Sequence, residues 1–272
     1  VVHLAAVCND PIGNFNSEIT HDINVNGTLK LAQNAKKNGV RKFIFSSSCI
    51  MYGASDNSIV NEDSPLDPKT AYAKSKVIAE IELSKLADEN FSPIFLRNGT
   101  VYGYSPRMRF DTVLNNFVES LYFNNKITIK SDGSPWRPIV HVNDVCASIE
   151  KFIDYENIEK IHNQAFNNGS DDLNYTIKNL AERLTSEIPN TFFEILSEGD
   201  ADIRTYKANF DKIKKLFPNF EFKHKPIESG VDLLNKIREL NIDKNSAIKF
   251  YRLKAIQDKI DKKIIDNNFY VL

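Results

Sequence analysis

Three short apolar runs alternate with two longer amphipathic segments over the first hundred residues. The runs are VVHLAAV (1–7), KFIFSSS (42–48) and PIFLRN (93–98). Continuous apolar runs of this length are typical of strands in a parallel sheet that is covered on both faces. The segments 19–38 and 70–89 carry apolar residues at helical spacing, and Gly39 follows the first of them where helices commonly end.

This strand–helix–strand–helix–strand order predicts an α/β fold with a doubly wound parallel sheet and right-handed crossovers. The second half of the chain has a less regular pattern. There we expect helices over 110–124, 143–154, 173–188 and much of 227–265, and short strands over 126–130, 139–142 and 191–196.

Composition and charge exclude several classes of protein. The 272 residues carry 35 Lys+Arg against 36 Asp+Glu, a net charge of −1, which argues against a nucleic-acid-binding protein. Hydrophobic residues make up 42% of the chain, too many for a disordered protein. No apolar run is long enough to span a membrane.

The cysteines and the first residues bear on the compartment. Cys8, Cys49 and Cys146 fit neither a zinc spacing nor a disulfide framework, so we expect no metal site and a reducing cytoplasm. The chain opens inside an apolar run at Val1, without the charged segment of a signal peptide. We therefore expect that the natural N-terminus lies upstream of Val1.

The segments SSSCIMYG (46–53) and AYAKSK (71–76) carry candidate chemistry. Tyr72 and Lys76 lie one helical turn apart, so their side chains share a face of the predicted helix. A cation beside a tyrosine favours the phenolate and lowers its pKa, which suits Tyr72 to act as a general acid or base. Serines at the end of a buried strand lie where open α/β sheets bind ligands.

Five ordered motifs together resemble the extended short-chain dehydrogenase/reductases of the NAD-dependent epimerase/dehydratase type. The motifs are HLAA (3–6), NVNGT (24–28), FIFSSSCIMYG (43–53) with YAKSK (72–76), LRNGTVYG (96–103) and WRPIVHVNDV (136–145). The resemblance covers residues 1 to about 185. It implies an enzyme with a Rossmann-like, N-terminally incomplete sheet over 1–105. A mainly substrate-binding region over 106–272 follows, from which about 136–155 returns to the core.

The resemblance assigns roles to individual residues. It makes Ser48, Tyr72, Lys76 and Asn24 the catalytic group, with Tyr72 as the acid/base at a sugar hydroxyl. Residues that would bind the cofactor are Ala5, Ala6, Ser46, Tyr72 and Lys76. Residues that would bind a nucleotide-diphosphate sugar are Ser48, Thr100, Arg109 and Arg137, with Arg137 on a diphosphate oxygen.

The sequence departs from the family at the cofactor fingerprint. The ten glycines are scattered, and none form the GxxGxxG turn that in the family precedes the HLAA strand. The cofactor, NAD or NADP, therefore cannot be specified from the residues present. We also expect that the isolated chain binds NAD weakly and folds poorly, because no segment supplies the turn that holds the pyrophosphate.

The residues after Ser48 bear on the reaction. Dehydratases of the family place Asp and Glu there, whereas this chain has Cys49 and Ile50, which argues against dehydration. The resemblance then implies epimerisation of a nucleotide sugar through a transient keto intermediate, as in polysaccharide biosynthesis. A reductase of a keto-sugar nucleotide and an inactive binding remnant stay open as alternatives. A homodimer is also open, and no nucleic-acid or membrane partner is expected.

Overall fold

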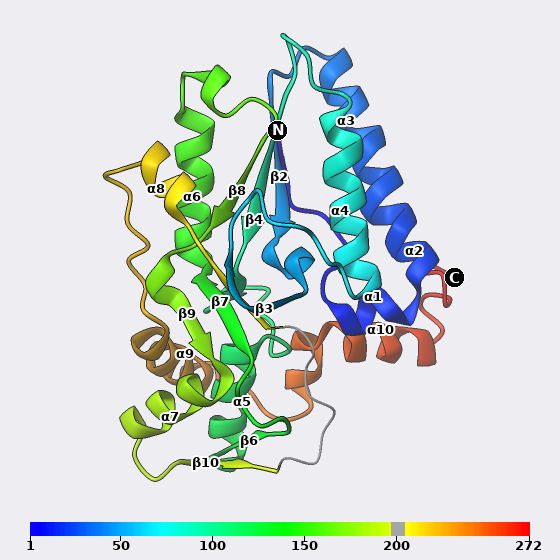
Figure 1. Cartoon of the computed structure of the whole chain (residues 1–272). Coiled ribbons are helices and arrows are strands. Elements are labelled where there is room, and N and C mark those ends of the chain that lie inside the picture. The colour runs from blue at the N-terminus through cyan, green and yellow to red at the C-terminus, as the bar shows by residue number, and fades with distance from the viewer. Residues whose placement is uncertain (197–204) are drawn as a thin grey trace.

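A four-stranded parallel sheet forms the centre of the upper part of the molecule (Figure 1). The computed structural model describes residues 1–196 and 205–272, without the side chains of 56–58. The strand order of the sheet is β1-β2-β4-β8. The strands are β1 (Val2–His3), β2 (Lys42–Ser48), β4 (Ser92–Asn98) and β8 (Gln164–Asn168). All three pairings are parallel, which confirms the predicted α/β fold.

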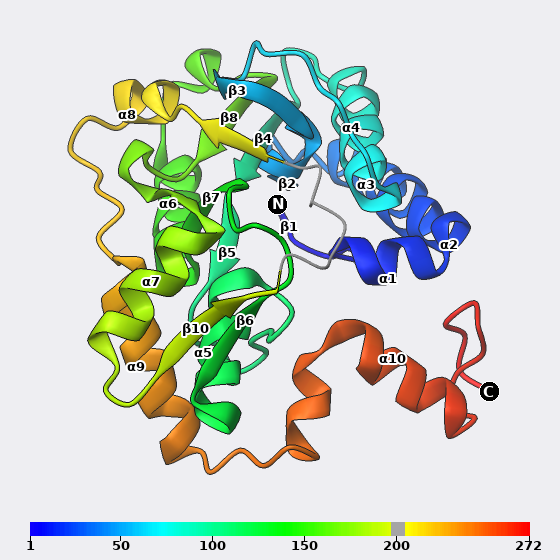
Figure 2. The same ribbon diagram turned by 60° about the horizontal axis from the view of Figure 1, so that its bottom comes forward.

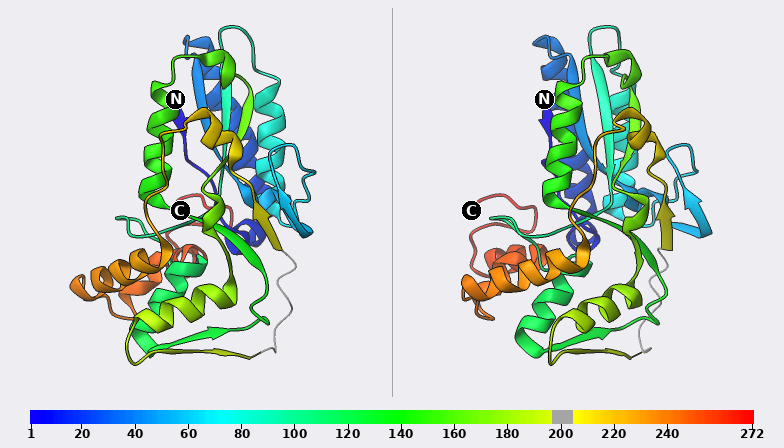
Figure 3. Two further views of the ribbon diagram at one scale, coloured as in Figure 1. Left: turned by 60° about the vertical axis from the view of Figure 1, so that its left-hand side comes forward. Right: turned by 90° about the vertical axis from the view of Figure 1, so that its left-hand side faces the viewer.

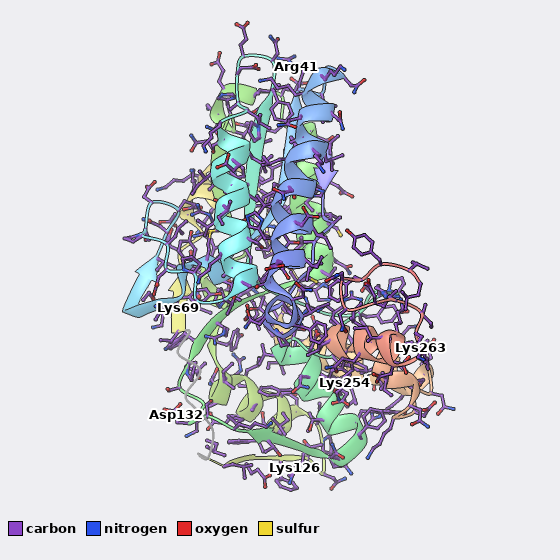
Figure 4. All side chains as sticks on the ribbon, turned by 90° about the vertical axis from the view of Figure 1, so that its right-hand side faces the viewer. Arg41, Lys69, Lys126, Asp132, Lys254 and Lys263 are labelled. Atoms are coloured by element: carbon purple, nitrogen blue, oxygen red, sulfur yellow. The ribbon has the colours of Figure 1, made fainter. Side chains whose placement is uncertain are left out.

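Alternate residues of β2 and β4 face opposite sides of this sheet. On one side, Phe43, Phe45 and Phe95 pack with the alanines and leucines of α3 (Thr28–Lys37) and α4 (Ala71–Ser84). Figure 4 shows these two helices side by side outside the sheet, below Arg41. Because successive side chains of a strand point to opposite faces, every second residue of these strands contacts this helical layer.

The opposite side of the sheet is covered by α6 (Val142–Asp154) and α8 (Asp211–Leu216), as both views of Figure 3 show. Ile44 and Leu96 belong to this second cluster, together with Phe152 from α6 and Ile213 from α8. Both faces of β2 and β4 are thus buried, as their continuous apolar runs predict.

The first strand is shorter than predicted. The expected strand 1–7 pairs with β2 only at Val2 and His3, and the Leu4 side chain is 62% exposed. The Asn24 side chain accepts a hydrogen bond from the Val7 N–H and donates one to the Val7 carbonyl. A side chain therefore satisfies backbone groups that a longer strand would have paired within the sheet.

The predicted helix 19–38 consists of three pieces. It comprises α2 (Ser17–His21), a π-helix (Asp22–Gly27) and α3, and a short helix α1 (Asp10–Phe15) precedes it. Gly39 ends α3 with φ +75°, as predicted. The hydrogen bonds of a π-helix span five residues and not four, and such turns are often found at functional sites. Here it contains Asn24.

Several short strands lie outside the central sheet, and the sequence pattern predicted only some of them. β3 (Ala54–Val60) lies between the predicted strand 42–48 and the predicted helix 70–89, and it pairs with β11 (Thr205–Ala208). A three-stranded sheet has the order β5-β7-β9, in which β7 starts at Trp136 and not at the predicted 139. The three strands of this sheet are β5 (Thr100–Tyr102), β7 (Trp136–His141) and β9 (Asn174–Thr176). A separate pair is formed by β6 (Lys126–Ile129) and β10 (Phe192–Ile195).

The lower part of the molecule is built around helices α5 (Val113–Asn124), α7 (Ile177–Glu187) and α9 (Pro226–Glu239), which share one hydrophobic cluster. Single 3-10 turns are found at Cys49–Tyr52, Ile158–Lys160, Asp171–Leu173 and Ser246–Phe250. No helix in residues 1–196 and 205–272 combines the length and the apolar character needed to cross a bilayer.

The last helix returns to the start of the chain. Figure 2 shows α10 (Arg252–Asp261) and the tail beside α1 and α2. The rings of Phe15 and Phe269 stack with centroids 6.2 Å apart, and the Asn16 amide donates to the carbonyl of Asn267. The tail thereby holds α1 against the rest of the molecule.

His141 caps α6 and makes the stability of the fold pH-dependent. Its ring is buried and stacks on His224 with centroids 4.2 Å apart. Burial, and then the neighbouring His224, lower the pKa of His141 to about 4, although Asp144 and Asp232 act in the opposite direction. His141 is therefore neutral in the folded protein at a pH where the unfolded chain binds a proton.

We expect the free energy of unfolding to fall by ~2–3 kcal/mol as the pH drops from about 6.5 to about 4 because of His141. Urea unfolding across this range should show a shallower pH dependence for His141→Gln than for the parent. The exposed His21 provides the matched control, and His21→Gln should keep the parental slope. An unchanged slope in His141→Gln would contradict the assignment.

Candidate active site

A cavity of about 620 Å³ opens at the carboxyl ends of β2, β4 and β5. Six of the residues predicted to be functional line it, namely Ser46, Ser48, Tyr72, Thr100, Arg109 and Arg137. Asn24 and Lys76 lie just behind this wall. The carboxyl ends of parallel strands are where open α/β sheets bind ligands, so the fold brings these residues to the expected place.

Ser48 and Tyr72 meet at the wall of the cavity. Ser48 is the last residue of β2, and its hydroxyl accepts a hydrogen bond from the Ile50 N–H at 3.3 Å. Tyr72 lies in the first turn of α4 and lines the same cavity, where the Ser48 side chain acts to lower the pKa of Tyr72. Two hydroxyl groups from different elements thus face the same space.

The N-terminus of α4 is held from two sides. The Thr70 hydroxyl accepts a hydrogen bond from the Ala73 N–H and donates one to the Asp10 carboxylate. Gly13 of α1 lies so close that a Cβ there would be 3.0 Å from the Cβ of Tyr72. The close approach of α1 fixes the position of Tyr72.

Lys76 is only 3% exposed and points toward the end of β2. Its ammonium group donates to the Ser46 carbonyl at 2.7 Å and lies 4.4 Å from the centroid of the Phe45 ring. Burial lowers the pKa of Lys76 to about 8, while Cys8 and Glu80 act in the opposite direction. Burial therefore brings the pKa of Lys76 below that of an ordinary lysine.

The pKa of Tyr72 is shifted in the direction opposite to the prediction. Burial raises the pKa of Tyr72 above its ordinary value, and the nearby Cys8 adds to the rise. The cation that opposes the rise is Arg109. Lys76 stands 5.8 Å from the Tyr72 ring centroid, but its ammonium bonds to the strand carbonyl and not to the phenol.

Asn24 links the loop after β1 to α4. Besides its two bonds to Val7, its amide donates to the Ser75 hydroxyl at 2.9 Å. Ser75 in turn donates to the Tyr72 carbonyl. Asn24 is therefore placed behind Tyr72, where it orients α4 without lining the cavity.

Arg109 belongs to a polar cluster that the sequence did not predict. Its Nε donates to the Asp111 carboxylate at 2.7 Å, and its Nη1 lies 3.6 Å from the Cys8 sulfur. Asp111 also accepts from the Asn9 amide and from the Arg252 N–H at the start of α10. The cluster joins three separate segments and holds the guanidinium at the cavity.

Arg137 and Thr100 lie on neighbouring strands of the second sheet. Arg137, on β7, is 9% exposed and donates through Nη1 to the Trp136 carbonyl at 2.7 Å. Its guanidinium lies 6.0 Å from the ring centroid of Tyr206. Thr100 is the first residue of β5. Both residues line the cavity, so each can contact a bound ligand.

Only some of the residues predicted to bind the cofactor line the cavity. Ser46 lines the cavity, and its hydroxyl accepts a hydrogen bond from the Asn98 amide at 3.1 Å. Ala5 is exposed and Ala6 half-buried in the loop after β1, and neither lines the cavity within the described part of the chain. The structure does not gather all the predicted cofactor residues around one space.

Comparison with known proteins decides the family. The model of the NAD dependent epimerase/dehydratase family matches residues 1–169. The chain belongs to this family. The match includes the segments that carry Ser48, Tyr72 and Lys76.

The relatives of this epimerase/dehydratase family member differ in their reactions. A dTDP-D-glucose 4,6-dehydratase of Mus musculus is 33% identical over 132 residues, which are 48% of this chain and 36% of that protein. A UDP-glucuronate 4-epimerase of Thermodesulfobacterium geofontis is 28% identical over 223 residues, which are 79% of this chain and 65% of that protein. The chain spans 36% to 52% of the length of the first four curated relatives.

Solved structures share the fold of this family member. The UDP-glucuronic acid 4-epimerase of Bacillus cereus, in complex with UDP-glucuronic acid and NAD, superposes with a TM-score of 0.73 at 22% identity. The superposition covers 88% of this chain and 76% of that one. The likeness therefore extends beyond the segment that the family model matches.

Proposed function

We propose that this protein epimerises a nucleotide-diphosphate sugar through a transient keto intermediate, with NAD or NADP as the cofactor. The observation that carries the proposal is the meeting of Ser48 and Tyr72 at the cavity wall, with Lys76 one turn behind. Both the family membership and the NAD-bound epimerase of the same fold support it.

The chain's own residues would act on one sugar hydroxyl. Tyr72 would take the proton from that hydroxyl and give it back at the end of the reaction. The Ser48 hydroxyl would hold the oxygen through the keto stage. Arg109 would stabilise the phenolate of Tyr72, since its charge already favours that form.

The described residues fit one end of the cofactor. The Lys76 ammonium has three donors and uses one on the Ser46 carbonyl, so it could also bind a ribose hydroxyl. The buried Ser47 hydroxyl lines the cavity and has no hydrogen-bond partner among the described residues. The bound cofactor would supply hydride transfer, and the centre would be inverted because the hydride taken from the sugar carbon would be returned to the opposite face of that carbon.

The pyrophosphate end of the cofactor has no comparable place in the described residues. Gly13 and Gly27 lie within helices, and Gly13 packs against Tyr72 and not at an open helix N-terminus. A glycine-rich turn before a helix is the usual site for that group. We therefore expect weak NAD binding by the chain alone, which calorimetry would measure.

Cys49 argues against dehydration. Its sulfur is buried and donates to the Arg97 carbonyl at 3.0 Å. Burial raises the pKa of the Cys49 thiol well above its usual range. A thiol in that state cannot replace the carboxylic acid that moves a proton in the family's dehydratases.

A reductase of a keto-sugar nucleotide is the second candidate, because it would use Ser48, Tyr72 and Lys76 in the same way. The purified protein can be incubated with UDP- or dTDP-linked hexoses and their uronic acids, with and without added NAD, and followed by NMR. An epimer that forms without net change of NAD supports the proposal. Consumption of NADPH with a keto sugar would favour the reductase, and no turnover with either would favour a binding remnant.

Replacing Arg137 with alanine is expected to raise the KM for the nucleotide sugar by about 10- to 150-fold with little change in kcat. A charge-assisted contact to a bound phosphate contributes on the order of 1.5–3 kcal/mol. The control is Arg238→Ala on α9, an exposed residue whose guanidinium donates a hydrogen bond to the Asn235 side chain. An unchanged KM in the Arg137 variant would place this residue outside the substrate site.

A further inference from the structure

A buried ion pair lies beneath the candidate active site. The Arg97 side chain, on β4, donates through Nη2 to the Glu80 carboxylate of α4 at 2.7 Å, and through Nε to both carboxylate oxygens. Both side chains are 8% exposed. The pair therefore joins the centre of the sheet to the helix that carries Tyr72 and Lys76.

The same guanidinium reaches the segment that follows Ser48. Its Nη1 donates to the Tyr52 hydroxyl at 3.1 Å and to the Glu62 carbonyl. The Tyr52 hydroxyl donates in turn to the Asn167 side chain on β8 at 2.7 Å. Arg97 thus connects α4 with the 3-10 turn that begins directly after Ser48.

Glu80 continues the functional face of α4. Tyr72, Lys76 and Glu80 are spaced four residues apart, so their side chains lie along one side of the helix. Lys76 and Glu80 are both buried, and each is tied to a different strand, Lys76 to β2 and Glu80 to β4. Two anchors on one face fix both the rotation and the axial position of the helix.

We propose that Glu80 is a positioning residue, which through its pair with Arg97 holds the helix bearing Tyr72 and Lys76 in register with the strand end bearing Ser48. The inference takes its catalytic meaning from the proposed function. Its test uses neither substrate nor cofactor, so the two can fail separately.

The energetics favour placement over stability as the role of this pair. A buried ion pair gains little stability compared with apolar side chains of the same size, because both charges lose their hydration. Its hydrogen-bond geometry, however, is directional, and Arg97 bonds to α4, to the 3-10 turn and to the Glu62 carbonyl after β3. An apolar contact at this position would tolerate sliding of α4 that the bidentate pair does not.

Glu80 also sets the charge environment of Lys76. The ionisable groups that act on Lys76 or are acted on by it are Cys8 from the loop after β1, His3 on β1, and Glu80. Burial and the Lys76 charge lower the pKa of His3, so His3 adds no positive charge at neutral pH. Glu80 is the carboxylate that, after Cys8, raises the pKa of Lys76 against the effect of burial.

The test measures the pKa of Lys76 and the amide exchange of the first turns of α4. Protein labelled with ¹³Cε-lysine is titrated by NMR, and Lys76→Arg identifies the resonance. The variants are Glu80→Gln and Glu80→Gln/Arg97→Gln, the second of which leaves no unpaired buried charge. Glu82→Gln is the matched control, because Glu82 lies on the same helix but bonds to Lys85.

We expect both Glu80 variants to lower the pKa of Lys76 by about one unit and to speed amide exchange over 71–76 on the order of tenfold. The Glu82 variant should change neither. Parental values for both measurements in the double variant would overturn the inference. A double variant that does not fold would also overturn it, since the pair would then be needed for the fold and not for placement.

Discussion

Replacing Tyr72 with phenylalanine is expected to lower turnover of a nucleotide sugar by ~10²–10⁴-fold, the usual loss for a general acid or base. Tyr72 and Ser48 both line the cavity, and the charge of Arg109 favours the ionised form of the phenol. Phenylalanine keeps the ring and the Cβ that lies against Gly13, and removes only the oxygen. The loss should therefore appear in kcat, with a KM close to that of the parent.

The control for this measurement is Tyr122→Phe, which removes a phenol from α5 outside the cavity lining. It should retain parental kcat. Binding of the nucleotide sugar to Tyr72→Phe, measured by calorimetry, would show that the site is intact. Turnover of Tyr72→Phe within a factor of a few of the parent would refute Tyr72 as the acid/base.

Replacing Gly53 with alanine is expected to reduce the free energy of unfolding by ~3–5 kcal/mol. Gly53 has φ +66°, and a Cβ there would lie 2.0 Å from the carbonyl oxygen of Asp67. The Asp67 N–H is itself hydrogen-bonded to the Met51 carbonyl, so this backbone cannot move away freely. Strain and steric overlap therefore add at one position.

Gly39→Ala separates these two contributions. Gly39 has φ +75°, but no atom lies within 4 Å of the Cβ position. Alanine there should therefore reduce the free energy of unfolding only by the backbone strain, about 1–2 kcal/mol. Urea unfolding monitored by circular dichroism measures both variants. Equal losses at Gly39 and Gly53 would show that the contact with Asp67 is unimportant.

The sequence predicted the central strands and helices well because their pattern is periodic. β2 spans Lys42–Ser48 as expected, and α4 and β4 differ from their predicted ranges only at the ends. β3 was missed because its residues, ASDNSIV, lack an apolar pattern and pair with β11 from a distant part of the chain. Pairing between such segments depends on tertiary contacts that a local pattern does not contain.

The candidate site could be predicted only where a motif fixes the spacing. Ser48, Tyr72 and Lys76 could be predicted because each lies in a short motif. The hydrogen bond between Asp111 and the Arg252 N–H could not, because the two residues are far apart in the sequence and belong to no common motif. Arg97 did leave a signal, since it is a charged residue inside an otherwise apolar strand. The direction of the Tyr72 pKa could not be predicted, because it depends on burial more than on the neighbouring lysine.

The π-helix at Asp22–Gly27 has a consequence for how this segment tolerates insertions and deletions. Deleting one residue there would restore regular α-helical hydrogen bonds, and by helix energetics alone it would be favourable. Because the wide turn accommodates one extra residue between α2 and α3, the deletion would leave the faces of both helices nearly unchanged. The loss would fall on the turn itself, from which Asn24 bonds to Val7. We therefore expect homologous sequences to vary in residue type over this segment while keeping its length.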